Sequence, residues 1–132
     1  MIKYLKNPKA TKEVFTKDGW YKTGDLGIMD KDGYFFITVR IKELIIKGGE
    51  NIAPREIDDV LYRHKNVLEA ASFPLNDGNY GQIVAAAITV RPGKNVTESE
   101  LKKLCNDNMG DFRTPSKFFF IDQLPKGPSG KI

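Results

Sequence analysis

The chain of 132 residues is long enough for about one ordinary domain with a small appendage. Hydrophobic residues make up 40% of it and charged residues 29%, which are globular proportions and exclude a chain that is disordered throughout. Its 21 basic and 17 acidic residues give a formal net charge of +4, which fits either an ordinary lysine-rich surface or an anionic ligand such as a nucleotide or coenzyme.

The first 40 residues are predicted to form a short helix followed by turn-rich aromatic strands. Asn7 can cap a helix over "NPKATKEVF", and Pro8 suits the first turn of that helix. Asp-Gly pairs at 18–19 and 32–33 are favoured in tight turns, and they punctuate strand-like runs at 20–21 and 34–37. This region has little apolar surface that it could bury by itself.

From about residue 43 the pattern changes to strands that alternate with two helices. A short strand at 44–46 is broken by a double glycine, and "TESE" at 97–100 forms a capping box at the second helix. The expected order is strand, helix, two strands, helix and strand, at residues 44–46, 53–67, 67–75, 82–93, 96–109 and 117–124. This order predicts an α+β fold, in which a short mixed sheet is flanked by helices on one side.

The single cysteine and the single histidine are not predicted to be catalytic. Cys105 lies in a helical pattern, where a small buried apolar residue is the better interpretation, and an unpaired cysteine suits a reducing cytoplasm. His64 is interpreted as a surface residue at a helix end, because no pattern of nucleophiles or metal ligands accompanies it. We recognise no signal peptide and no apolar run of membrane-spanning length.

Three charged residues near the end of the first region are candidates for binding a ligand. The carboxylate of Asp25 can accept hydrogen bonds from the two vicinal hydroxyls of a ribose, although an aspartate between glycines also forms turns. Arg40 and Lys42 follow an aromatic strand. They suit either phosphate and ribose contacts or the protection of a sheet edge by charge.

Two glycine-rich stretches are further candidates. Gly48 and Gly49 bring unhindered backbone next to Lys47, as a narrow ligand passage requires, but a double glycine also makes an ordinary turn. The last stretch, "GPSGKI", is not a phosphate-binding P-loop, because that motif needs four residues between its glycines and a Ser or Thr after the lysine. Lys131 is therefore expected to act as a single mobile cation.

Taken together, the motifs resemble those of the adenylate-forming enzymes, which include acyl-CoA synthetases, peptide-synthetase adenylation domains and firefly-type luciferases. The resemblance rests on "GWYKTGDLG", "DGYFFITVRIKELIIKGGENIAPREID" and "LPKGPSGKI", which follow family order and spacing over practically the whole chain. It implies the last strands of a large amino-terminal domain at residues 1–41, followed by the small carboxy-terminal domain at residues 42–132.

The resemblance also implies a two-step reaction for the complete enzyme. A carboxylate first attacks ATP, which gives an acyl-adenylate and pyrophosphate, and the Mg²⁺ that accompanies ATP is bound by the large domain. The small domain then rotates about its hinge, and a thiol, usually that of coenzyme A, displaces AMP.

Site residues carry over from the family one by one. By this resemblance Asp25 and Arg40 hold the ribose hydroxyls of ATP, and Lys42 is the hinge residue, which also contacts the adenylate. The missing side chains at residues 48–49 leave room for the pantetheine arm of CoA. Lys131 corresponds to the adenylation lysine, whose ammonium group neutralises the negative charge that the carboxylate and the α-phosphate gather in the transition state.

Two departures from the family pattern affect these expectations. Val39 stands before Arg40 where the family usually has glycine, so the strand end is expected to be stiffer. The phosphate loop, the adenine-binding motif and the acyl pocket of the large domain are not among these 132 residues, so the chain alone is expected to be inactive and the acid it serves stays open.

Alternative functions follow from the same residues. Within the family, the chain could belong to an adenylation domain that loads a carrier protein. Outside it, a non-catalytic module could bind a separate large domain or a CoA-like thiol. A basic nucleic-acid binder is disfavoured, because the aromatic residues are expected in core strands and not as exposed stacking platforms.

Overall fold

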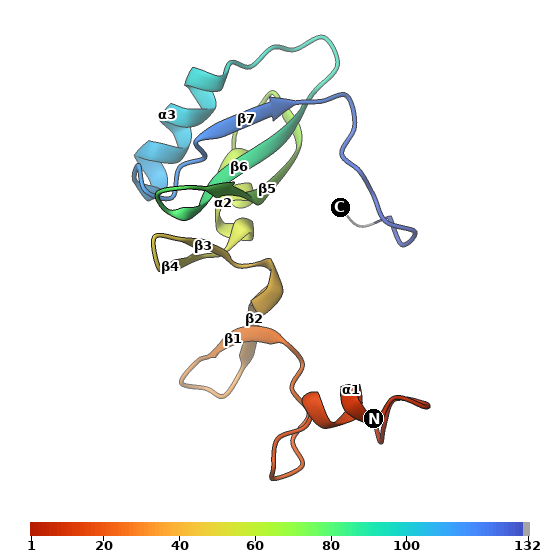
Figure 1. Cartoon of the computed structure of the whole chain (residues 1–132). Helices are drawn as coiled ribbons and strands as arrows, with labels where there is room; N and C mark the ends of the chain where they lie inside the picture. The colour runs from red at the N-terminus through yellow and green to blue at the C-terminus, as the bar shows by residue number, and fades with distance from the viewer. Residues whose placement is uncertain (131–132) are drawn as a thin grey trace. The chain divides into compact units, whose positions relative to one another are not determined.

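The computed structural model describes residues 1–130, which fall into two compact units (Figure 1). The first unit is Met1–Lys42, and the second begins at Glu43, one residue after the boundary expected from the sequence. Each unit has its own sheet. Within residues 1–130, no helix is both long and apolar enough to cross a lipid bilayer.

The first unit opens with helix α1, Pro8–Glu13. The side chain of Asn7 caps it as expected, since Asn7 Oδ1 accepts a hydrogen bond from the Ala10 amide at 3.0 Å. The helix ends before Phe15, which was expected to belong to it and instead forms an isolated bridge with Tyr21. The strand expected at 20–21 is reduced to that one bridge, because the turn at 16–20 closes it on one side and Val14, the helical C-cap of α1, ends it on the other.

Strands β1 (Asp25–Met29) and β2 (Phe35–Arg40) form the predicted antiparallel hairpin. Asp30 Oδ1 accepts hydrogen bonds from the amides of Asp32 and Tyr34, both at 2.9 Å, and this fixes the turn. The register shifts between Leu26 and Gly27, which marks a bulge.

The apolar side chains of this hairpin are exposed, contrary to the expectation that they would occupy core strands. Phe35 is 77% exposed and Ile37 67%, and on the alternate positions Phe36 is 52% exposed. A two-stranded hairpin with apolar side chains on both faces is marginal in water without a cover. The first unit therefore presents an apolar surface that its own residues do not bury.

The second unit holds a five-stranded mixed sheet (Figure 1). Its strands are β3 Ile45–Lys47, β4 Glu50–Ile52, β5 Val67–Asp77, β6 Gly81–Val90 and β7 Lys117–Phe120. The order β4-β3-β6-β5 is antiparallel throughout, and β7 pairs with β6 in parallel. Strand β4 was not expected, because the double glycine was interpreted as the end of a strand and is in fact the turn of a hairpin.

Helices α2 (Pro54–Leu61) and α3 (Glu98–Met109) complete the predicted α+β fold. Both helices share one core with the sheet face that carries Val84, Ala86 and Ile88. The Thr97 hydroxyl accepts a hydrogen bond from the Glu100 amide, and the Glu100 carboxylate accepts one from the Thr97 amide at 2.7 Å, so the predicted capping box is confirmed.

Candidate functional site

The β1–β2 hairpin brings Asp25 and Arg40 together. They are register partners at the open end of the hairpin, and Arg40 Nε lies 3.4 Å from Asp25 Oδ1. The backbone around Asp25 is fixed on both sides. The Gly24 carbonyl accepts a hydrogen bond from the Ile41 amide at 2.8 Å, and the Asp25 amide donates one to Thr23 Oγ1 at 3.1 Å.

This geometry leaves the Asp25 carboxylate able to accept further hydrogen bonds. An ionised carboxylate has about four acceptor positions, and the ion pair with Arg40 uses one of them at a long distance. The Asp25 side chain is 25% exposed and that of Arg40 is 70% exposed, so a ligand can reach both. A pair of hydroxyl donors and a nearby anionic group would suit these two side chains.

Lys42 lies in a single turn of 3₁₀ helix, η1 (Ile41–Glu43), that contains the boundary between the two units. Its side chain is exposed. A position where the chain passes from one unit to the next is where a change of a few backbone dihedral angles would move one unit relative to the other.

Gly48 and Gly49 form the two-residue turn between β3 and β4. Their φ angles are +56° and +86°, and Lys47 pairs with Glu50 across the turn. A two-residue hairpin with positive φ at both positions is a type I′ turn, which favours glycine for backbone reasons alone. A Cβ on Gly49 would meet no heavy atom within 4 Å, whereas one on Gly48 would lie 3.2 Å from the Tyr80 ring.

The burial of Lys47, the lysine before this turn, was not predicted. Lys47 is only 6% exposed, and its Nζ donates a hydrogen bond to the Phe112 carbonyl at 2.6 Å. The same Nζ lies 4.6 Å from the ring centroid of Phe112 and 5.6 Å from that of Tyr80, within cation–π range. Alternation along β3 places Lys47 on the same face as the buried Ile45, and this alternation was the one sign in the sequence that Lys47 is buried.

Two further interactions fix the surroundings of the turn. The Gly48 amide donates a hydrogen bond to the Tyr80 carbonyl at 2.9 Å. The guanidinium of Arg113 donates two hydrogen bonds to Glu50 Oε1, at 2.8 and 3.0 Å, and lies 3.4 Å from Glu56. The turn is thus connected to the β5–β6 hairpin, to α2 and to the segment after α3.

The candidate Lys131 lies outside the described residues. The chain that leads to it leaves β7 and contains the buried Leu124, which is 2% exposed, and an ion pair between Lys126 and Glu69 at 2.6 Å. Of the sequence-predicted site residues, the structure brings together Asp25 with Arg40 in the first unit, and the two adjacent glycines in the second.

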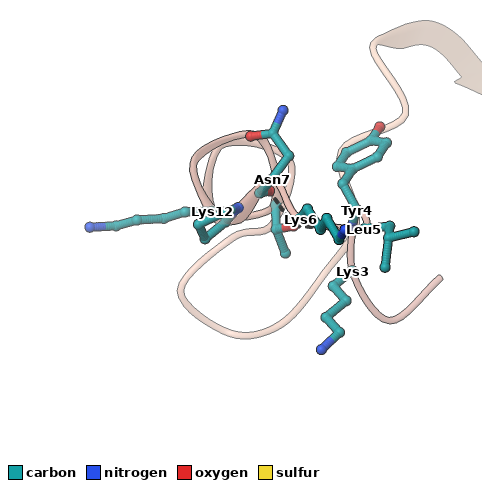
Figure 2. A pocket seen from close by; sticks show the side chains of 8 residues that line it. Lys3, Tyr4, Leu5, Lys6, Asn7 and Lys12 are labelled. Atoms are coloured by element: carbon teal, nitrogen blue, oxygen red, sulfur yellow. Dashed lines mark hydrogen bonds between the residues drawn. The ribbon is translucent and has the colours of Figure 1, made fainter.

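A surface hollow of about 500 Å³ lies around the start of α1 (Figure 2). Eight consecutive or neighbouring residues line it: Lys3, Tyr4, Leu5, Lys6, Asn7, Pro8, Thr11 and Lys12. In Figure 2 the side chain of Lys12 extends to the left and that of Lys3 extends downward, so their ammonium groups do not converge on a common anion. None of the candidate residues contributes to this hollow.

The structure bears out the interpretation of Cys105 and modifies that of His64. Cys105 is fully buried in α3, and burial raises the pKa of its thiol to about 11, which keeps it protonated and unreactive. His64 follows α2 and is half-buried, and its Nδ1 accepts a hydrogen bond from the Asn66 amide at 3.3 Å. Within residues 1–130, no three His, Cys, Asp or Glu side chains gather where they could hold a metal ion.

Comparison with known proteins identifies the family. Residues 56–131 match the family described as AMP-binding enzyme C-terminal domain. The chain is 52% identical over 132 residues to the sulfoacetate–CoA ligase of Cupriavidus necator, and 44% identical over 130 residues to the oxalate–CoA ligase of Saccharomyces cerevisiae. These two matches include 100% and 98% of this chain, but only 26% and 24% of the lengths of the two ligases.

A solved structure agrees with the sequence comparison. The chain matches ATP-bound MatB from Rhodopseudomonas palustris with a TM-score of 0.93 at 32% identity, covering 98% of this chain and 26% of MatB. The chain therefore spans about a quarter of the length of the relatives it matches. More than half of its residues lie within the family match. The chain belongs to the AMP-binding enzyme C-terminal domain family.

Proposed function

We propose that this chain is the carboxy-terminal part of an ATP- and CoA-dependent carboxylate ligase that forms AMP. The observation that carries the proposal is 52% identity along all 132 residues to a CoA ligase. The ATP-bound MatB structure supports the use of ATP, because its fold matches this chain at 32% identity. We propose a cytoplasmic location, with which the free and buried cysteine of this part is compatible.

In the first step, a carboxylate oxygen of the acid attacks the α-phosphorus of ATP. The bond to the bridging oxygen of the β-phosphate breaks, pyrophosphate leaves, and an acyl-adenylate forms. Asp25 accepts hydrogen bonds from the ribose hydroxyls and Arg40 contacts the same nucleotide, which the open geometry of this ion pair supports. Lys131 neutralises the charge gathered at the carboxylate and α-phosphate, an effect worth about 10²–10³ in rate for one such electrostatic donor.

In the second step, the thiol of CoA attacks the acyl carbon, the bond to the phosphate oxygen of AMP breaks, and the thiol proton is released. We propose that Lys42 is the hinge about which the second unit changes its position between the steps. The pantetheine arm then passes the turn at residues 48–49. The open space around the Cα of Gly49 supports this passage.

The acid is selected outside this chain. Relatives that share 52% and 44% identity with it over the same stretch are named for different acids, sulfoacetate and oxalate. The phosphate loop, the Mg²⁺ of ATP and the acid pocket would belong to a large domain. The same domain would cover the exposed apolar side chains of the hairpin in the first unit. The isolated 132 residues are therefore expected to be inactive.

The test is carried out in a polypeptide that joins this chain to its large domain, with the two half-reactions measured separately. Lys131→Ala should abolish ATP–pyrophosphate exchange and leave the release of AMP from supplied acyl-adenylate and CoA nearly unchanged. Lys102→Ala, on the exposed side of α3, is the matched control and should change neither half-reaction. Equal losses in both half-reactions would overturn the assignment, and so would pyrophosphate exchange by the isolated 132 residues.

A second pair of variants tests the thiolation turn. Gly49→Leu should lower the rate of thiolation and spare adenylation, the reverse of Lys131→Ala. Gly93→Leu is the control, because Gly93 shares the positive φ of Gly49 and the open space where a Cβ would lie, but belongs to the loop between β6 and α3. Replacing CoA with a phosphopantetheine-bearing carrier protein in the same assay identifies the acceptor. Faster transfer to the carrier would favour the alternative of a carrier-loading adenylation domain.

A further inference from the structure

The segment between β7 and the end of the chain is attached to the second unit at three successive points. The Ile121 amide donates a hydrogen bond to the Ile88 carbonyl at 3.0 Å, which continues the β6–β7 ladder by one residue. Leu124 is then buried, at 2% exposure. Finally Lys126 Nζ donates a hydrogen bond to Glu69 Oε1 at 2.6 Å, an ion pair that joins residues 57 positions apart in sequence.

Glu69 is held firmly enough to serve as a fixed partner for Lys126. It belongs to β5, where it pairs with Thr89 of β6, and its amide donates a hydrogen bond to Thr89 Oγ1 at 2.9 Å. Thr89 is only 1% exposed. The side chains of Glu69 and Lys126 are 25% and 36% exposed, so the pair is partly shielded from water and from salt.

Beyond Lys126 the attachments stop within the described residues. Residues 127–130 are exposed, and the Gly130 amide donates a local hydrogen bond to the Gly127 carbonyl at 2.9 Å. Figure 1 shows this part of the chain as a coil without helix or strand. Lys126 is therefore the last described residue that a long-range contact attaches to the sheet.

We propose that the Lys126–Glu69 ion pair is a positioning device for the adenylation lysine, an inference that rests on the proposed role of Lys131. With the pair formed, Lys131 lies five positions beyond its last attachment. Five residue steps can span at most about 17 Å when fully extended. Without the pair, the last attachment is Leu124, and the tether grows from five residues to seven.

The size of the expected effect follows from the tether and the ion pair. The effective concentration of a tethered group falls roughly as the −3/2 power of tether length, so lengthening from five to seven residues costs a factor of about 1.7. A partly exposed ion pair favours the attached state by up to about fivefold, so the pair is formed in most molecules. Removing it can cost no more than the full effect of the longer tether, so adenylation should fall about 1.5-fold when the pair is removed.

The experiment uses the polypeptide that joins this chain to its large domain, with variants Lys126→Met, Glu69→Gln and Lys126→Arg. The first two should lower ATP–pyrophosphate exchange about 1.5-fold, leave thiolation of supplied acyl-adenylate unchanged, and increase hydrogen exchange of the Ile121 amide, the last amide before this segment that donates to the sheet. Lys126→Arg keeps the charge and should restore both readouts. Lys102→Met, which removes a lysine without an ion pair in the described part of the chain, is the control.

Two results would overturn this proposal. One is unchanged pyrophosphate exchange or unchanged hydrogen exchange of the Ile121 amide in both Lys126→Met and Glu69→Gln. The other is an equal loss of thiolation, which would show that the pair supports the whole unit and not the position of one lysine. Lys131→Ala in the same assays separates the two proposals. If it fails to stop adenylation, the proposed function of Lys131 is wrong, whereas if it succeeds while the pair variants have no effect, only the positioning role is wrong.

Discussion

Asp25 and Arg40 stand opposite each other across the first two strands, 15 positions apart in sequence, with Arg40 Nε 3.4 Å from Asp25 Oδ1. This distance is longer than the 2.7–2.9 Å of a strong charge-assisted hydrogen bond. The pair is also largely exposed on the arginine side, so it contributes little to stability. The pair instead holds the Asp25 carboxylate in a fixed position, where its oxygens can still accept hydrogen bonds from a ligand.

Asp25→Asn should therefore affect nucleotide binding and not folding. The amide replaces an anionic acceptor with a neutral one and loses one or two charged hydrogen bonds to the ribose, each worth about 1.5–3 kcal/mol. In the polypeptide with its large domain, the KM for ATP should rise roughly ten- to hundredfold. The melting temperature should stay the same. Asp32→Asn, in the turn of the same hairpin, is the control, and an unchanged KM for ATP in Asp25→Asn would exclude the ribose contact.

Gly49→Ala should destabilise the second unit although nothing blocks the added methyl group. The φ of +86° is a conformation that alanine rarely adopts, and holding it there costs about 1–2 kcal/mol. Gly78 also has open space but no positive φ, so Gly78→Ala should be neutral or slightly stabilising. Urea unfolding followed by circular dichroism compares the two variants. Equal stabilities would mean that the backbone conformation is not what requires glycine at position 49.

The features predicted from sequence are those with a local signal. The capping box at Thr97, the Asn7 cap and the turn at 32–33 each depend on residues within a few positions, and all three form as expected. The α+β fold followed from the periodicity of apolar residues. Motif resemblance also pointed to Asp25, although its pairing with Arg40 requires the register of the hairpin.

What the sequence did not reveal depends on contacts between distant residues. Strand β4 was missed because a double glycine ends a strand or turns a hairpin with equal ease. The burial of Lys47 requires Phe112, 65 positions later, and the attachment of Lys126 requires Glu69, 57 positions earlier. Exposure of the aromatic residues of β2 was mispredicted because alternation alone does not tell whether a strand has a neighbour to cover it.

Asp58 should make the second unit less stable as the pH rises from 4 to 6. Burial raises the pKa of Asp58 from 3.8 to about 6, although the hydrogen bond that the Ser72 amide donates to Asp58 Oδ1 at 2.7 Å opposes this shift. Between these two values the folded chain binds more protons than the unfolded chain. The contribution of Asp58 is therefore fully present below pH 4 and is lost as the pH rises through 6, by about 2–3 kcal/mol.

Asp58→Asn isolates this contribution, because the amide oxygen can still accept the Ser72 hydrogen bond but carries no charge. The variant should be about 1–2 kcal/mol more stable than the original chain at pH 7, and the difference should vanish near pH 4. Urea unfolding at several pH values measures both. Asp59→Asn, at the exposed neighbouring position, should show no such dependence. A loss of stability in Asp58→Asn at pH 7 would contradict the sign of the argument.

Lys47 and Phe112 should be energetically coupled through the aromatic ring as well as through the backbone. Lys47→Met keeps most of the buried stem but removes the ammonium group, and Phe112→Leu removes the ring while the carbonyl at position 112 stays. In a double-mutant cycle, the coupling free energy therefore reports the cation–π contact at 4.6 Å and not the hydrogen bond at 2.6 Å.

We expect a favourable coupling of about 0.5–2 kcal/mol from chemical unfolding. The same cycle between Lys47→Met and Tyr62→Leu, at the exposed end of α2, should give no coupling. A value near zero for the Phe112 cycle would mean that the Phe112 ring does not hold the buried lysine in place, which leaves this role to the hydrogen bond to the Phe112 carbonyl and to the Tyr80 ring.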